Sequence, residues 1–335
     1  MSELLLTYIV PVYNTEGYLD RCLSSIIAQG LPDDAYEVLV VDDGSTDGSR
    51  DQVVAFTLLH PQVHLIIQDN AGVSAARNHA LDEARGRYVQ FVDSDDYLEH
   101  GAMSSLLRQA VDEDLDVLQF GYKSIDAMGA VSPGSEAADA SAAVMTGAEY
   151  LEGHSLTPYV WRFLVKRSYL ESHHWRFDTS LIVCEDGALI AEFMLAAGRM
   201  VCTAAAPYCY VKRDDSAMHN VDVQHLKRRI FSQIDSAAMI DATIRRYEAD
   251  NGRQAPASVP GLRNVYLFFA MTKALTCGCV DDAVQRMRQS GIYPFPCVGP
   301  ESNYYGMKWK VIHALMMRPG LWSMMSKAYR VLKKS

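Results

Sequence analysis

Three carboxylates lie within four positions at the end of an apolar run in the stretch "YVQFVDSDDYL", residues 88–98. Asp93, Asp95 and Asp96 repel one another at this spacing, and the repulsion grows as a site becomes buried. A hard divalent cation offsets such a cluster, because Mg²⁺ and similar ions take carboxylate oxygens and keep positions for water and substrate phosphates. The alternative is a solvated acidic turn that caps a helix beginning after Asp95 or Asp96. The surrounding elements must decide between the two.

Apolar runs alternate with amphipathic segments over the first 120 residues. The segment 16–29 places Leu19, Cys22, Leu23, Ile26 and Ile27 on one helical face. The apolar runs are "LLLTYIVPV", "YEVLVVDD", "VHLIIQ", "RYVQFVD" and "LDVLQFGY", with a helix expected near 99–112 before the last of them. Strands that are apolar throughout and separated by helices predict a parallel sheet covered on both faces.

Polar and turn-forming residues follow these strands, in "PVYN", "VVDDGS", "QDNAG" and "VDSDD". Ligands of open parallel sheets bind beyond the carboxyl ends of the strands, so these groups are expected to share one edge. Neither G-x-G-x-x-G nor G-x-x-x-x-G-K-[ST] follows the first strand. The pattern therefore disfavours a dinucleotide oxidoreductase and a P-loop enzyme.

The composition describes an ordinary globular protein of 335 residues, 49% hydrophobic and 21% charged. A net charge of −10 argues against a general nucleic-acid binder. Seven cysteines without a C-x-x-C pair favour a reducing compartment. The first residues are typical of a strand and not of a signal peptide, and no apolar run is long enough to span a bilayer. A cytoplasmic location is expected.

Four separated blocks resemble the family-2 glycosyltransferases: "IVPVYNTEGYLDRCLSSIIAQ", "VLVVDDGSTDGS", "NAGVSAARNHAL" and "YVQFVDSDD". Weaker matches extend the resemblance over about residues 5–219. It implies the GT-A fold, an α/β Rossmann-like, mostly parallel sheet flanked by helices, with a helical C-terminal extension. The expected parts are a nucleotide-sugar-binding half (1–98), an acceptor-binding half (99–220) and a helical region (221–335).

The resemblance also implies an activity. A family member of this kind is a hexosyltransferase that moves a sugar, here expected from a UDP-linked donor, to a glycan or lipid-linked glycan acceptor in bacterial surface polysaccharide synthesis. Inversion in a single displacement is implied, with Mn²⁺ or Mg²⁺ as cofactor.

The family's site residues map onto this chain at matching motif positions. The expected nucleotide-binding residues are Pro11, Val12, Tyr13, Asn14, Asp42, Asp43, Arg77, Asp93, Ser94, Arg213 and Ser216. Asp95 and His219 are the expected metal ligands, Asp186 the general base and Glu185 its catalytic neighbour. Trp161, Arg162 and Arg176 are candidates for the acceptor site.

Structural roles compete with several of these assignments. Asp42 and Asp43 are also turn formers, and Arg77 fits a solvated helix position. Asp186 could cap a helix that starts after it, and Trp161 could belong to the core.

Rival functions remain at this stage. A nucleotidyltransferase or another metal-dependent nucleotide-binding enzyme would use the same acidic stretch. This chain, however, lacks the basic triphosphate loop that a nucleotidyltransferase would have after the first strand. A haloacid-dehalogenase-type phosphatase would have Thr or Val at the position where this chain has Tyr97. A non-catalytic binding module would not need Asp93, Asp95 and Asp186 together.

The last part of the chain is basic, because no acidic residue follows Glu301 while seven lysines and arginines do. In "LWSMMSKAYRVLKK" an apolar stripe opposes a basic face, a pattern typical of interfacial helices. Residues 308–334 are therefore expected to contact the inner face of the plasma membrane, making the protein peripheral. The alternative is that the stripe packs on the protein itself.

Overall fold

The computed structural model describes residues 4–126, 129–131, 143–212 and 223–293, together with Arg318, Gly320, Leu321 and Met324. The chain divides into two compact units. Unit 1 comprises Met1–Tyr150, Tyr159–Thr179 and Ala196–Ser216, and unit 2 comprises Leu151–Pro158, Ser180–Leu195 and Ala217–Ser335. The boundaries expected near residues 98 and 220 stay predictions.

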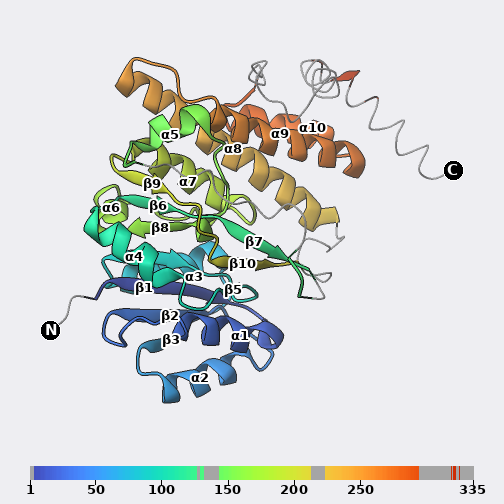
Figure 1. The fold of residues 1–335 in the computed structure, drawn as a ribbon. Coiled ribbons are helices and arrows are strands. Elements are labelled where there is room, and N and C mark those ends of the chain that lie inside the picture. The colour runs from blue at the N-terminus through green and yellow to red at the C-terminus, as the bar shows by residue number, and fades with distance from the viewer. Residues whose placement is uncertain are drawn as a thin grey trace. The chain divides into compact units, whose positions relative to one another are not determined.

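Unit 1 is built on a seven-stranded sheet with the order β3-β2-β1-β4-β8-β6-β9 (Figure 1). The strands are β1 (Leu6–Val12), β2 (Tyr36–Asp42), β3 (Val63–Ile67), β4 (Tyr88–Phe91), β6 (Val117–Gln119), β8 (Phe163–Lys166) and β9 (Met200–Cys202). The pairs among β1 to β4 and the pair β6–β9 are parallel. This mostly parallel sheet with helices around it confirms the expected α/β class.

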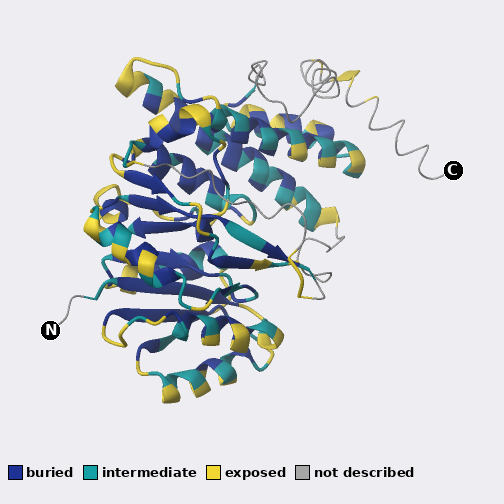
Figure 2. Ribbon diagram, viewed as in Figure 1, coloured by how far each residue is buried: buried dark blue, intermediate teal, exposed yellow. Residues whose placement is uncertain are grey.

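The sheet's first four strands follow the apolar runs of the sequence. Every residue of β1, β2 and β4 is buried, as the dark ribbon in Figure 2 shows. Helix α1 (Glu16–Ile27) buries Leu19, Cys22, Leu23 and Ile26 of its predicted apolar face, while Ile27, the last residue of the helix, is only partly buried. The other helices of this part are α2 (Ser49–Leu59), α3 (Val73–Glu83) and α4 (Met103–Asp112).

The order β3-β2-β1-β4 places the change of winding direction between β1 and β4. In register, Val12 lies beside Asp42, and Ile9 lies beside Phe91. The residues that follow β1, β2 and β4 therefore gather at one edge of the sheet. An α/β sheet offers its ligand crevice at such a switch point.

Two expectations from the sequence are corrected by long-range pairing. The run 115–122 forms no single strand, because it divides into β6 and β7 (Tyr122–Ile125), which join different sheets. Strand β8 inserts antiparallel between β4 and β6. Helix α4 and strand β6 still follow β4 in the chain, but β6 does not pair with β4 because β8 lies between them.

A second sheet has the order β5-β10-β7, with β5 (Tyr97–Leu98) and β10 (Tyr208–Val211) antiparallel and β10 parallel to β7. Strand β5 follows the acidic stretch directly, and α4 begins only at Met103. The alternative in which Asp95 or Asp96 caps a helix is therefore wrong. The acidic stretch lies instead in the turn between two strands.

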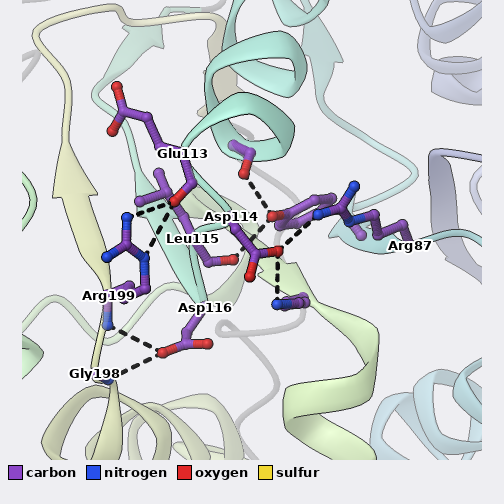
Figure 3. Close-up of polar contacts among 10 residues, drawn as sticks. Arg87, Glu113, Asp114, Leu115, Asp116, Gly198 and Arg199 are labelled. Carbon is purple, nitrogen blue, oxygen red and sulfur yellow. Dashed lines mark hydrogen bonds and ion pairs between the residues drawn. The ribbon is translucent and has the colours of Figure 1, made fainter.

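A polar network fixes the start of β6 (Figure 3). The Asp116 carboxylate accepts hydrogen bonds from the backbone N–H groups of Gly198 and Arg199, each at 3.0 Å. The Arg199 guanidinium donates to the carbonyl oxygen of Glu113, and Asp114 accepts from Arg87 at 2.6 Å. These contacts hold β6 and the approach to β9 at the edge opposite the acidic stretch.

Three short elements complete this part of the chain. They are α5 (Gly147–Gly153), a 3₁₀ turn at Val160–Arg162 that leads into β8, and α6 (Arg167–Ser172).

Unit 2 is helical in its described residues. Its elements are α7 (Glu185–Ala196), α8 (Val223–Asn251), α9 (Ser258–Cys277) and α10 (Val280–Gln289). Helix α8 buries Ile230, Ile234, Ile240 and Ile244 among other residues, and α9 packs along it. The helical C-terminal region expected from the sequence is confirmed by α8 to α10.

Candidate active site

Asn14, directly after β1, clasps the loop that follows β2. Its backbone has φ +53°, and its Oδ1 accepts the backbone N–H of Thr46 at 2.8 Å. Its own N–H donates to the Ser45 hydroxyl at 3.1 Å. The neighbouring Pro11 and Val12 are buried in β1, whereas the Tyr13 side chain is exposed. The loop after β1 is therefore fixed and presents one exposed aromatic ring.

Asp42 is fully buried at the end of β2 and is held from two sides. Its Oδ1 accepts the Ser45 N–H at 3.0 Å, which makes a local turn, and its Oδ2 accepts from Arg50 Nε at 2.6 Å. The predicted turn-forming role is confirmed by these contacts. Arg50, on α2, was not found from the sequence, because its link to Asp42 depends on how α2 starts.

Asp43 joins the end of β2 to the start of α3. Its carboxylate accepts from the backbone N–H groups of Ala71 at 2.8 Å and Gly72 at 2.9 Å, and from Gln68 Nε2 at 2.8 Å. Gly72 has φ +90°, a backbone conformation that glycine adopts without strain. Asp43 thus orients the helix that carries Arg77.

Arg77 forms an ion pair with Asp93, with 2.9 Å between Nη2 and Oδ1. The guanidinium also lies over the Phe177 ring, with Cζ 5.2 Å from its centroid. The Arg77 side chain is only 4% exposed, while that of Asp93 is 31% exposed. The alternative of a solvated helix residue is therefore wrong, because α3 places Arg77 against the acidic stretch.

Asp96 is turned inward and fastens β10. Its carboxylate accepts from the Tyr208 hydroxyl at 2.8 Å and from the Val211 N–H at 2.7 Å. Burial, followed by the charges of Asp93 and Asp95, holds the pKa of Asp96 well above its usual range. Of the three carboxylates, this one has a structural role.

Tyr208 is a residue that sequence reasoning missed. Its hydroxyl accepts the Asp93 N–H at 3.1 Å while donating to Asp96. The alternation "YCYV" in an apolar strand was the available signal, but nothing in it identified the partner 112 positions away.

Asp95 and Asp93 are the partly exposed carboxylates of the stretch, and Ser94 between them is buried and accepts from the Thr15 hydroxyl at 3.1 Å. Within the described residues, no group of three or more His, Cys, Asp and Glu side chains is arranged as a metal site. One or two carboxylates together with substrate phosphates are nevertheless the usual surroundings of Mg²⁺. Asp93 and Asp95, both partly exposed, are suitable oxygen ligands for such an ion.

Glu185 and Asp186 lie in unit 2, in the first turn of α7. Asp186 is the second helical residue, so the N-cap alternative is wrong. Carboxylates are favoured near a helix N-terminus by the partial positive charge there. Gly187 follows, and a Cβ at this position would lie 2.1 Å from the Tyr266 hydroxyl oxygen. A glycine is therefore required where α7 passes α9.

The segment before Asp186 is tied to α8 by two buried serines. The Ser232 hydroxyl accepts the N–H groups of Ile182 at 3.0 Å and Val183 at 3.1 Å. The Ser236 hydroxyl donates to the carbonyl oxygen of Cys184 at 2.8 Å. Cys184 has φ +64°, a strained conformation for a residue with a side chain, and such strain persists only when the surroundings enforce it.

The three acceptor-site candidates lie in unit 1. Trp161 is 3% exposed and stacks with aromatic neighbours, which confirms its core position. Arg162 is also buried and donates from Nε to the Phe120 carbonyl oxygen at 3.0 Å. Arg176 pairs with Asp82, with 2.7 Å between Nη2 and Oδ1.

Arg213, Ser216 and His219 lie outside the described residues, as does nearly all of the segment 308–334. Across the described part of the chain, no helix combines the length and hydropathy needed to cross a membrane.

The model of the family "Glycosyl transferase family 2" matches residues 7–173. The succinoglycan biosynthesis protein ExoO of Rhizobium meliloti (strain 1021) is 30% identical over 258 residues, 73% of this chain and 69% of ExoO. The uncharacterized glycosyltransferase EpsJ of Bacillus subtilis (strain 168) is 31% identical over 220 residues, 63% of this chain. The chain spans 62% of EpsJ and only 17% of the glycosyltransferase GlyA of Streptococcus pneumoniae.

Solved structures show the same fold. S. aureus TarS 1-349 matches with a TM-score of 0.66 at 20% identity, over 97% of this chain and 91% of that one. Its complex with UDP-GlcNAc has a TM-score of 0.60 with the same coverage. The mannosyltransferase PcManGT from Pyrobaculum calidifontis, in complex with GDP-Man and Mn²⁺, has a TM-score of 0.52 at 16% identity, over 100% of this chain and 89% of that one. The sheet is that of the GT-A fold, and the chain belongs to glycosyl transferase family 2.

Proposed function

We propose that this chain is an inverting glycosyltransferase that moves a sugar from a UDP-linked donor to a hydroxyl group of a glycan or lipid-linked glycan in bacterial surface polysaccharide synthesis. The observation that carries the proposal is the switch-point edge of the sheet. There Asp42, Arg77 and Asp93, from three separated segments, are buried or held by buried partners. Polysaccharide synthesis is supported by ExoO, whose name places it in succinoglycan biosynthesis.

The nucleotide is assigned to the edge formed by the loops after β1 and β2. The exposed Tyr13 ring offers a stacking face beside the buried Pro11 and Val12. An ionised carboxylate is an acceptor only, so Asp42 or Asp43 suits the imide N–H of a uracil base. Arg77 and Asp93 lie next along the edge and are assigned to the diphosphate and ribose.

A divalent cation, Mn²⁺ or Mg²⁺, would be held by Asp95, with His219 as a second protein ligand. Bound there, it would offset the negative charge that grows on the departing diphosphate. Support comes from the surplus of carboxylates at 93–96 and from PcManGT, whose structure contains GDP-Man and Mn²⁺.

Asp186 is assigned as the general base. Its carboxylate would take the proton of the acceptor hydroxyl as that oxygen attacks the anomeric carbon, and Glu185 would complete the acidic turn. A single displacement at that carbon inverts its configuration.

The Asp95 assignment is tested by calorimetry of UDP binding in the presence of Mn²⁺. Asp95→Asn keeps the side-chain shape and removes one charge, so metal-dependent UDP affinity should be lost. Asp51→Asn makes the same change at an exposed position on α2 and should bind as the wild type does. Unchanged affinity in Asp95→Asn would refute the metal assignment.

The Asp186 assignment is tested by separating binding from transfer. Asp186→Asn should bind UDP normally and transfer no sugar, because an amide does not accept the proton. Asp281→Asn, in the first turn of α10, is the matched control for an acidic residue at a helix start. Transfer by Asp186→Asn at the wild-type rate would place the base elsewhere.

A peripheral location at the inner face of the plasma membrane belongs to the same proposal. It is supported by the sequence of residues 308–334, in which basic residues oppose an apolar stripe. Truncation after Pro319 should abolish co-sedimentation with anionic liposomes while donor hydrolysis continues. Full-length protein that ignores such liposomes at low salt would contradict this location.

A further inference from the structure

Four tyrosine side chains of unit 1 form one aromatic cluster around Trp161. The rings of Tyr159, Tyr208 and Tyr210 lie within 16° of parallel to the indole, at centroid distances of 5.1, 4.2 and 6.0 Å. Tyr122 meets the indole edge-on at 5.1 Å and 79°. Offset and edge-to-face pairs are the favourable geometries for aromatic rings, so the cluster is a rigid assembly.

The cluster has a buried foundation and an exposed rim. Trp161 and Tyr208 are 3% and 0% exposed, whereas Tyr159 and Tyr210 are 42% and 40% exposed. Tyr122 also contacts both exposed rings: its ring centroid lies 6.1 Å from that of Tyr159 and 6.5 Å from that of Tyr210. Two large aromatic faces are thus held in nearly one orientation at the surface. Exposed aromatic faces that are held rigidly by buried rings are well suited to bind a flat apolar ligand face.

The exposed rim lies beside the acidic stretch. Tyr210 stands on β10 between Tyr208 and Val211, and both of these residues hydrogen-bond the Asp96 carboxylate. Tyr208 also accepts the Asp93 N–H. The cluster and the carboxylates are therefore parts of one connected structure, and a ligand resting on Tyr210 would lie next to Asp93 and Asp95.

The chemistry of this surface selects a neutral, hydroxylated ring. The face of an aromatic ring carries partial negative charge and attracts the weakly positive C–H groups on one face of a pyranose. A phosphate or sulfate at the same place would be repelled by Asp93 and Asp95. The positive charge of Lys123, on the neighbouring strand β7, is paired with Glu99. Rigid tyrosine rings also lose little conformational entropy when a ligand binds.

We propose that Tyr159 and Tyr210 form a stacking platform for a neutral hexopyranose ring, with Trp161 and Tyr122 as its support. Naming this ring as the acceptor sugar rests on the glycosyltransferase function proposed above. The platform itself is a carbohydrate site that stands on the ring geometry alone. Stacking on the platform would place the acceptor sugar beside the carboxylates assigned to the donor.

Saturation-transfer NMR on the full-length chain tests the platform. Aromatic protons are saturated, and the ring protons of two probes are observed, methyl β-D-galactopyranoside and methyl β-D-glucopyranoside. Transfer to the C–H protons of at least one probe is expected in the wild type. Tyr159→Ala and Tyr210→Ala should each raise the dissociation constant of that probe about tenfold, which corresponds to the loss of one aromatic contact.

Two further variants separate stacking from other effects. Tyr210→Phe keeps the ring and should bind the probe as the wild type does. This variant tests the platform even if the alanine variants do not fold. Phe269→Ala removes an aromatic ring of similar exposure, 49%, from α9 and should leave probe binding unchanged. Loss of binding in Tyr210→Phe would assign recognition to the hydroxyl and overturn the stacking model.

The outcome is read independently of the transferase proposal. Calorimetry of UDP with Mn²⁺ on the same wild-type sample tests that function. Probe binding without UDP binding would support the platform and contradict the transferase assignment. UDP binding without saturation transfer to either probe would overturn the platform and leave the transferase assignment in place.

Discussion

The hydroxyl of Ser232 donates a hydrogen bond of 2.8 Å to the carbonyl oxygen of Val183. The same hydroxyl accepts hydrogen bonds from the N–H groups of Ile182 and Val183. Its one donor and two acceptor positions are therefore all used by the segment before α7. Ser236 repeats the contact one turn later at Cys184. Helix α8, which lies beyond the part of the chain matched by the family model, therefore sets the path into the turn that carries Asp186.

Ser232→Ala should lower the free energy of unfolding by about 0.5–1.5 kcal/mol, because it removes the hydrogen bonds that the buried Ser232 hydroxyl makes with Ile182 and Val183. It should also reduce sugar transfer more than UDP affinity. Thr243→Val is the control, since it removes an α8 hydrogen bond to Glu192, farther along α7. Chemical denaturation and transfer assays on both variants provide the measurement. An equal loss of transfer in Thr243→Val would show that stability, not the path before Asp186, explains the effect.

Gly187→Ala should destabilise unit 2 by about 1–3 kcal/mol, because the new methyl group would overlap the Tyr266 hydroxyl. Tyr266→Phe removes that oxygen and leaves the ring carbon Cζ at 2.9 Å from the new Cβ. The double variant should therefore recover part of the loss. A double-mutant cycle from thermal denaturation measures the coupling. If the changes in unfolding free energy of the two single variants simply add up in the double variant, the predicted overlap between the new methyl group at position 187 and the Tyr266 hydroxyl would be contradicted.

Gly86 and Gly17 should respond in opposite ways to alanine. A Cβ on Gly86 would lie 2.5 Å from the backbone carbonyl carbon of Leu6 and the nitrogen of Thr7, which belong to a buried strand. Gly86→Ala should cost about 3 kcal/mol, since backbone atoms cannot move aside cheaply. Gly17, on α1, has nothing within 4 Å, so Gly17→Ala should stabilise by about 0.5–1 kcal/mol. Melting temperatures that fall in both variants would refute the contrast.

Asp114 should contribute stability that disappears in acid. Hydrogen bonds from Lys166 and Arg87 hold the pKa of this carboxyl below its usual range. A carboxyl with a lowered folded-state pKa stabilises the fold above its unfolded pKa of about 3.9, and this contribution is lost as the pH falls through the folded value. Asp114 is exposed, so the effect should stay under about 1 kcal/mol. Asp114→Asn should melt below the wild type at neutral pH, and the difference should close at low pH.

The first half of the main sheet was predictable because its signals are local. Strands β1, β2 and β4 are buried on both faces and therefore read as unbroken apolar runs. The helices between them show a clear apolar stripe, as α1 does with Leu19 and Ile26. Polar residues placed directly after such strands must meet at one edge, so the grouping of Asp43 and Asp93 followed from the chain order alone.

The remainder depends on contacts that no local pattern records. Strand β5 has two residues and exists because it pairs with β10, more than one hundred positions later. The inward turn of Asp96 likewise requires Tyr208, and the burial of Arg77 requires Phe177. The sequence did not show that Asp96 turns inward, because the partners that give it a structural role lie more than one hundred positions later.

The carboxylate of Asp43 also has a consequence for hydrogen exchange. The N–H groups of Ala71 and Gly72 lie in a turn outside any strand ladder, yet both are bonded to Asp43. They should exchange with solvent deuterium slowly, because exchange requires that their hydrogen bonds to this carboxylate first break. A nucleotide that engaged Asp43 would compete for the same oxygens and speed their exchange, whereas one that engaged only Asp42 would leave it unchanged. Two backbone amides thus report which of the adjacent aspartates meets the base.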